Sequence, residues 1–168
     1  MNLIEKIRQG KIFIYPTDTI YGIGCNALNK KSIEKIKVIK KRENKPLSVI
    51  APSIEWIKKN LIIDIDLKKY LPGPYTLLLK KKDRDFLKHV SDNELLGVRI
   101  PDCDFTELIQ KSEVPFITTS VNLSGEPPVK KISEIPLEIK NKIDVIVDVG
   151  PLTGKPSTLV INGREIKR

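Results

Sequence analysis

The sequence has little of the residues that usually carry nucleophilic or metal chemistry. It contains one histidine, His89, and two cysteines, Cys25 and Cys103, which stand far apart in the chain. A structural zinc site needs several Cys or His ligands, and Ser-His-Asp or Cys-His systems need a histidine beside their nucleophile. Because His89 lies in the polar stretch FLKHVSDNE, we expect it at the surface. We therefore expect reduced, mostly buried thiols and neither of these kinds of site.

Long apolar runs are also missing. No stretch approaches the roughly 20 apolar residues that cross a bilayer, and the first residues, MNLIEKIRQGKIFIYPTDT, lack the apolar core and cleavage site of a secretory signal. We predict a cytoplasmic protein that is not inserted in a membrane. With 168 residues, the chain has the size of one ordinary domain.

Basic residues outnumber acidic ones. The sequence has 30 Lys and Arg against 21 Asp and Glu, for a formal charge of +9. This balance favours polyanionic partners such as RNA or nucleotides. A solvated, lysine-rich surface gives the same composition, so charge alone does not decide between the two.

Short apolar runs rich in β-branched residues alternate with lysine-rich helical patterns, which is typical of an α/β sheet domain. The expected strands are Lys11–Tyr15, Leu47–Ala51, Thr76–Lys80, Gly97–Ile100, Phe116–Thr119, Asp144–Asp148 and Thr158–Ile161, with Asn162-Gly163 as the turn of a final hairpin. The expected helices are Lys30–Lys41, capped by Asn29 or Ser32, then Ile54–Asn60, Asp66–Tyr70, Phe105–Lys111 and Ser133–Lys142.

Two polar segments adjoin strands in the first third of the chain. In PTDTIYGIG, residues 16–24, Thr17 and Thr19 offer hydroxyls, and the glycines would let a ligand approach the backbone. A plain proline–threonine turn explains this segment equally well. In KKRENKPLSV, residues 40–49, Lys40, Arg42 and Lys45 form a cationic loop that a triphosphate would suit. A helix end bearing lysines is the alternative, and no GxxxxGK[ST] loop occurs in the sequence.

Three later segments have the same character. Arg99 in GVRIPD lies within an apolar strand, so its guanidinium needs either a structural salt bridge or a carboxylate ligand. ITTSVNLSGEPP, residues 117–128, holds more hydroxyl and amide side chains than a turn requires. Such groups bind phosphate, ribose or carboxylate, although an Asx or Ser/Thr turn remains the alternative. A smaller cluster, Pro156-Ser157-Thr158, follows near the end of the chain.

Six segments in order resemble the successive motifs of the YrdC family. They are PTDTIYGIG, KxR followed by KPLSV, LPGPYTLLL, VRIPD, TSVNLSGEPP and DVGPLTGKPSTLVI, and they extend from about Tyr15 to Ile161. The resemblance implies an open, twisted, mixed α/β sheet with flanking helices and a concave basic face. It also implies a single YrdC-like domain over residues 1–168, without the C-terminal extension of longer relatives.

The implied reaction is that of a nucleotidyltransferase. L-Threonine, bicarbonate and ATP would give threonylcarbamoyl-AMP and pyrophosphate, for threonylcarbamoyladenosine formation next to the anticodon of tRNA. Mg²⁺ would accompany ATP, and a partner enzyme would modify the tRNA. Matching positions assign ATP binding to Lys40, Arg42, Lys45, Asn122, Ser124 and Arg168, and L-threonine binding to Thr19, Arg99, Ser120 and Ser157. No residue is assigned as a catalytic acid or base or as a protein ligand to metal.

Two other functions remain open. The same fold with a basic face would bind tRNA or double-stranded RNA without making the intermediate. A domain of this kind embedded in a larger protein would transfer carbamoyl groups during metallocentre maturation, but this sequence has no zinc-finger cysteines. The cationic loop and the cluster at residues 120–124 favour the synthase, because RNA contacts need only dispersed lysines.

Overall fold

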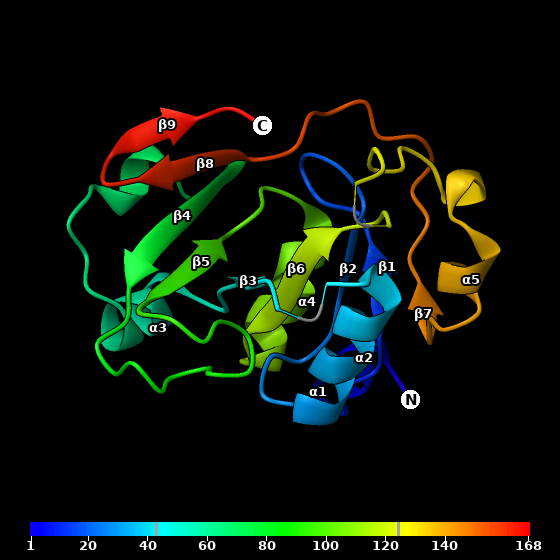
Figure 1. Cartoon of the computed structure of the whole chain (residues 1–168), viewed down its shortest axis with the longest axis horizontal. Coiled ribbons are helices and arrows are strands. Elements are labelled where there is room, and N and C mark those ends of the chain that lie inside the picture. The colour runs from blue at the N-terminus through cyan, green and yellow to red at the C-terminus, as the bar shows by residue number, and fades with distance from the viewer. Residues whose placement is uncertain (43, 124) are drawn as a thin grey trace.

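The computed structural model describes residues 1–42, 44–123 and 125–168, so that Ser124 lies outside the described residues. These residues form one nine-stranded sheet in the order β7-β1-β2-β6-β3-β5-β4-β8-β9 (Figure 1). Its strands are β1 Phe13–Tyr15, β2 Gly22–Gly24, β3 Ser48–Ile50, β4 Tyr75–Lys80, β5 Leu95–Arg99, β6 Phe116–Ser120, β7 Val145–Ile146, β8 Thr158–Ile161 and β9 Arg164–Ile166. The pairs β1/β7, β3/β5 and β4/β8 are parallel and the others antiparallel, which confirms the expected open mixed sheet.

The helices are α1 Leu3–Arg8, α2 Lys30–Lys40, α3 Ile54–Asn60, α4 Asp104–Ser112 and α5 Leu137–Lys140, with short 3₁₀ turns at Leu67–Lys69 and Ile132–Glu134. The apolar residues of α2 are buried where the helical period predicts, and the Asn29 side chain caps the helix by accepting a bond from the Ser32 amide. Among the described residues, no helix has the length and apolar character needed to cross a membrane.

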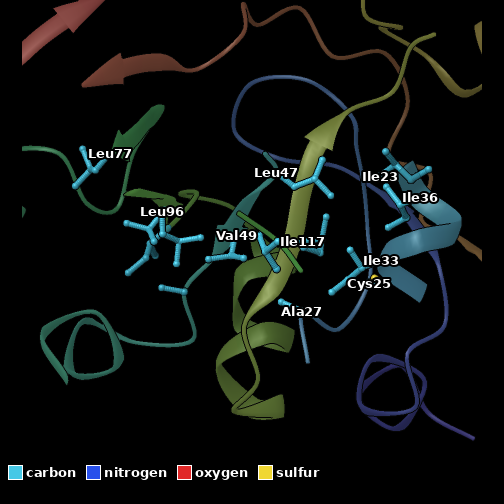
Figure 2. Packing of buried hydrophobic residues seen from close by; sticks show 14 of the residues in the cluster. Ile23, Cys25, Ala27, Ile33, Ile36, Leu47, Val49, Leu77, Leu96 and Ile117 are labelled. Atoms are coloured by element: carbon cyan, nitrogen blue, oxygen red, sulfur yellow. The ribbon is translucent and has the colours of Figure 1, made fainter. Parts of the chain in front are cut away.

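Two apolar clusters lie on opposite faces of the sheet. In the smaller one, Ile7 of α1 and Ile109 of α4 pack on Phe13, Tyr15 and other β-strand residues. In the larger one, Ile33 and Ile36 of α2 lie beside Ile23 and Cys25, and Val49, Leu77 and Leu96 continue the cluster across the sheet (Figure 2). Because successive side chains of a strand point to opposite faces, Ile14 joins the larger cluster while its two neighbours join the smaller. Burial of both faces fixes the strand ends that carry the polar segments.

Four elements differ from the sequence-based expectation. Helix α1 and strand β2 were not predicted. The predicted helix at residues 133–142 is divided into a 3₁₀ turn and the four-residue α5, because Pro136 cannot continue the preceding turn. The predicted helix at residues 66–70 is only a 3₁₀ turn at Leu67–Lys69.

The expected role of the glycines in residues 16–24 is wrong for Gly24. A Cβ at residue 24 would lie 1.8 Å from the carbonyl oxygen of Ile117 in β6. The close approach that this glycine permits is therefore between β2 and β6 and involves no ligand. Gly22 lies against the buried ring of Tyr15. A Cβ at residue 22 would be 2.8 Å from Cζ of that ring.

One long connection crosses the molecule. Residues 147–157, which we call the strap, lead from β7 at one edge of the sheet to β8, next to the other edge. Figure 1 shows the strap passing over the end of the sheet, beyond the tip of β6. It thereby brings residues from late in the sequence over the loop that follows β1.

Candidate active site

A cavity of about 280 Å³ opens where the polar segments meet. Its walls come from the β1–β2 loop, the loop after α2, strands β4 to β6, the strap and the C-terminal hairpin. Six of the residues with an assigned role line it: Thr19, Arg42, Arg99, Ser120, Ser157 and Arg168. These residues are spread over most of the sequence, and the sheet order brings them together.

Arg99 is almost fully buried, with 5% of its surface exposed. Its Nη2 forms an ion pair with the carboxylate of Asp18, and its Nη1 is 3.4 Å from Thr19 Oγ1. The other oxygen of Asp18 accepts a bond of 2.9 Å from the Asp102 amide. Arg99 Nε is buried and has no partner among the described residues. The salt bridge considered from the sequence therefore exists, and it leaves part of the guanidinium available to a ligand.

Arg42 and Arg168 add two further guanidinium groups to the same cavity. Among the described residues, neither pairs with a carboxylate: Arg42 Nη2 donates to the Pro46 carbonyl, and Arg168 donates to Ser157. Burial lowers the pKa of both, and for Arg168 the nearby charges of Arg99 and Arg42 lower the pKa further. An anion in the cavity would relieve this mutual repulsion.

Hydroxyl groups fill the space between the arginines. Thr17 Oγ1 lies 2.9 Å from Thr19 Oγ1 and donates to the Ile20 carbonyl. At the other end, the Ser157 hydroxyl lies 2.7 Å from Thr76 Oγ1 and accepts a bond of 2.6 Å from Arg168 Nη2. Each of these groups is oriented by protein contacts, so the cavity is organised without a ligand.

Lys40 lies beneath the cavity and is not part of its lining. Only 2% of Lys40 is exposed, and its Nζ donates to the Ser120 carbonyl and, over 2.8 Å, to Asn122 Oδ1. The Ser120 hydroxyl donates to the same Asn122 oxygen over 2.6 Å. Lys40 thus supports the end of β6 from inside the protein, a position that the lysine-rich pattern of its helix does not indicate.

Lys45 lies apart from these residues. It is exposed and lines a neighbouring hollow with Lys37, Lys88 and His89. His89 is exposed as expected, and both cysteines are free, with Cys25 buried and Cys103 half-buried.

Asp18, Tyr21 and Thr76 were given no role from the sequence. Tyr21 lines the cavity and joins the strap to β2: its hydroxyl donates to the Gly150 carbonyl over 2.6 Å and accepts from the Val149 amide over 3.0 Å. Thr76 has the sequence context of an ordinary strand residue. Its place in the site becomes visible through its contact with Ser157. Asp18 could have been predicted as the partner of Arg99, because a carboxylate beside two threonines is a natural partner for a buried arginine.

The donor set of the cavity suits an anion better than a free metal ion. Among the described residues, no Asp or Glu side chain lines it. Within residues 1–42, 44–123 and 125–168, no three His, Cys, Asp or Glu side chains come together as a metal site. Guanidinium and hydroxyl groups bind phosphates and carboxylates. A divalent ion would fit here as part of a nucleotide complex, held by phosphate oxygens and water.

Comparison with known proteins gives a consistent result. The Sua5/YciO/YrdC family model, which carries the description telomere recombination, matches residues 5–167. A Methanocaldococcus jannaschii protein with the provisional name threonylcarbamoyl-AMP synthase is 40% identical over 94% of this chain and 77% of its own length.

Comparison with solved structures indicates the same family. Pyrococcus abyssi Sua5 complexed with L-threonine superposes with a TM-score of 0.81 at 30% identity, over 94% of this chain and 48% of that protein. This chain therefore spans about half the length of the Pyrococcus protein. HypF in its phosphate- and nucleotide-bound form gives a TM-score of 0.82 at 25% identity, over 94% of this chain but 26% of that protein. With the family model matching nearly every residue, the chain belongs to the Sua5/YciO/YrdC family.

Proposed function

We propose that this protein is a threonylcarbamoyl-AMP synthase. Relatives at up to 40% identity carry that name, and a structural neighbour is a complex with L-threonine. The observation that supports the proposal best is the convergence of Arg42, Arg99 and Arg168 on one hydroxyl-lined cavity. Threonine, bicarbonate and ATP are all anionic or carry a carboxylate, and a cavity of this kind neutralises such groups.

In this proposal, the amino acid occupies the Arg99 end of the cavity. Its carboxylate meets the buried guanidinium, whose Nε lacks a partner, while Thr19, Ser120 and Ser157 offer hydroxyls. The ATP phosphates lie toward Arg42 and Arg168. Lys45, in the neighbouring hollow, and Ser124 are assigned from the motif alone. Asn122 and Lys40 hold the end of β6 against the nucleotide. ATP enters as its Mg²⁺ complex, and the ion neutralises phosphate charge.

The chemistry then needs little from the protein besides placement. The threonine amine attacks CO₂, and a carbamate forms as the nitrogen loses a proton. If bicarbonate is attacked instead, a C–O bond of bicarbonate also breaks and its oxygen leaves as water. A carbamate oxygen attacks the α-phosphorus of ATP, the bond to the β-phosphate oxygen breaks, and pyrophosphate leaves. Positioning and charge neutralisation by the arginines are the main contributions. We propose that this nucleotidyl transfer takes place in the cytoplasm and serves tRNA modification by a partner enzyme.

The decisive measurement is pyrophosphate release by the purified protein with MgATP and bicarbonate, with and without L-threonine. We expect threonine-dependent release, and a product whose mass is that of threonylcarbamoyl-AMP. Arg99→Ala should lower kcat/KM for threonine by about a hundredfold or more, because a buried charge-assisted contact to the substrate is lost. Asn122→Ala should lower the rate as well.

Lys59→Ala, at an exposed position of α3, is the matched control and should keep the parent rate. If neither product forms in the presence of threonine, the synthase assignment fails. A protein that then still binds tRNA would support the RNA-binding alternative, with which the charge of +9 is compatible. Carbamoyl transfer in metallocentre maturation has less support, because the sequence has no zinc-finger cysteines.

A further inference from the structure

The backbone of the strap approaches the backbone of the β1–β2 loop closely at Gly154. A Cβ at residue 154 would lie 2.3 Å from the carbonyl oxygen of Thr19 and 2.9 Å from its Cα. Real Cβ atoms do not approach backbone atoms so closely, so any side chain here would push the strap and the loop apart. The φ angle of Gly154 lies outside the left-handed region. The glycine is therefore required by the contact and not by a turn.

Thr19 stands between Gly154 and the buried arginine. The backbone of Thr19 faces the strap, while its hydroxyl lies 2.9 Å from Thr17 Oγ1 and 3.4 Å from Arg99 Nη1. Residues 156 and 157, just after Gly154, line the same cavity. A displacement at this contact would move Thr19 relative to Arg99 and would also move the opposite wall.

Other contacts hold the strap on both sides of Gly154. Before it, Tyr21 binds the strap at Val149 and Gly150. After it, the Ser157 hydroxyl lies 2.7 Å from Thr76 Oγ1 and accepts a bond from Arg168. Gly154 lies between these anchors, at the place where the strap meets the backbone of Thr19.

We propose that Gly154 is a positioning residue for the amino-acid end of the cavity. Its missing side chain lets the strap rest on Thr19, and this contact sets the distance between the Thr19 hydroxyl and the wall at residues 156–157. The inference rests on the proposed function for the identity of the ligand. The contact itself is independent of that function, so the two are tested separately.

The test compares Gly154→Ala with Thr153→Ala in the same strap. Thr153 is exposed, so shortening its side chain alters the strap next to Gly154 without bringing any atom against Thr19. Calorimetry measures the binding of L-threonine and, separately, of MgATP. We expect Gly154→Ala to raise the Kd for threonine at least tenfold while the Kd for MgATP changes less than threefold. Thr153→Ala should leave the threonine Kd within twofold.

Two outcomes overturn the proposal: an unchanged threonine Kd in Gly154→Ala, or an equal loss of threonine and MgATP binding. If the unsubstituted protein does not bind threonine, the proposed function fails and NMR decides on Gly154. Shifts of the Thr19 amide and Arg99 Nε–H in Gly154→Ala, absent in Thr153→Ala, support the positioning role, and unshifted resonances reject it.

A second variant covers the case in which Gly154→Ala does not fold. Tyr21→Phe keeps the ring but removes the hydroxyl bonds to Val149 and Gly150. A strap loosened in this way should rest less firmly on Thr19, so we expect a threonine Kd raised at least threefold with little change for MgATP. An unchanged Kd in this variant would count against the proposal.

Discussion

Lys40 is a cation buried at a high free-energy cost. Burial, and to a lesser extent the charge of Arg42, lowers its pKa to about 7. An unperturbed lysine has a pKa of about 10.4. Between these two values the unfolded chain binds the proton and the folded chain does not, so Lys40 makes the free energy of unfolding rise with pH. Below pH 7 Lys40 is protonated in both states and contributes no slope.

This slope can be measured with Lys40→Met, which keeps the length of the side chain without its charge. We expect the difference in unfolding free energy, parent minus variant, to increase from pH 7 to 8.5 by up to about 1.4 kcal/mol per pH unit, the limit for one proton. Urea unfolding at several pH values gives both curves. Parallel curves would mean that Lys40 keeps its ordinary pKa despite its burial.

At the scale of elements, the pairing of β2 with β6 depends on a glycine. A side chain at Gly24 would meet the Ile117 carbonyl, which belongs to the sheet backbone and cannot move alone. Gly24→Ala should therefore lower the unfolding free energy by about 3 kcal/mol, the upper range for overpacking. The midpoint of urea denaturation measures the loss. Val38→Ala, on the exposed face of α2, serves as the control and should change stability by less than about 0.5 kcal/mol.

The elements also show what local sequence can and cannot predict. Helix α2 and strand β8 were predicted closely, because the first has a clear apolar period and the second precedes an Asn-Gly turn. Strand β2 was missed because its sequence, GIG, has two poor strand formers and gains its order from its neighbours. Helix α1 was missed although a capping box, Asn2 with Glu5, marks its start.

The residues of the site also divide into those that local sequence predicts and those that it does not. A charged residue within an apolar strand, such as Arg99, can be recognised from the sequence as a group that needs a partner. The burial of Lys40 under Ser120 and the contact of Gly154 with Thr19 arise from packing between segments far apart in the chain. No local pattern encodes such contacts, so they become visible only when the sheet is assembled.

For the whole molecule, the charge of +9 bears on the proposed contact with tRNA. Lysines that neutralise phosphates release counterions, so affinity for RNA should fall steeply with salt. We expect unmodified tRNA to bind at least tenfold more weakly at 200 mM than at 50 mM NaCl, as for about two or more phosphate contacts. Filter binding measures this dependence, and a flat salt profile would argue against a phosphate interface.

The strap ties the cavity to the completion of the entire chain. The walls of the cavity include Thr17 from the β1–β2 loop, Ser120 from β6 in the middle of the sheet, and Arg168 after β9. The strap links β7, at one edge of the sheet, to β8, next to the other edge. Contacts over such long stretches of sequence form late, since loop closure must precede them. We therefore expect ligand binding only after the last strands have joined the sheet, so that binding during synthesis would signal a completed fold.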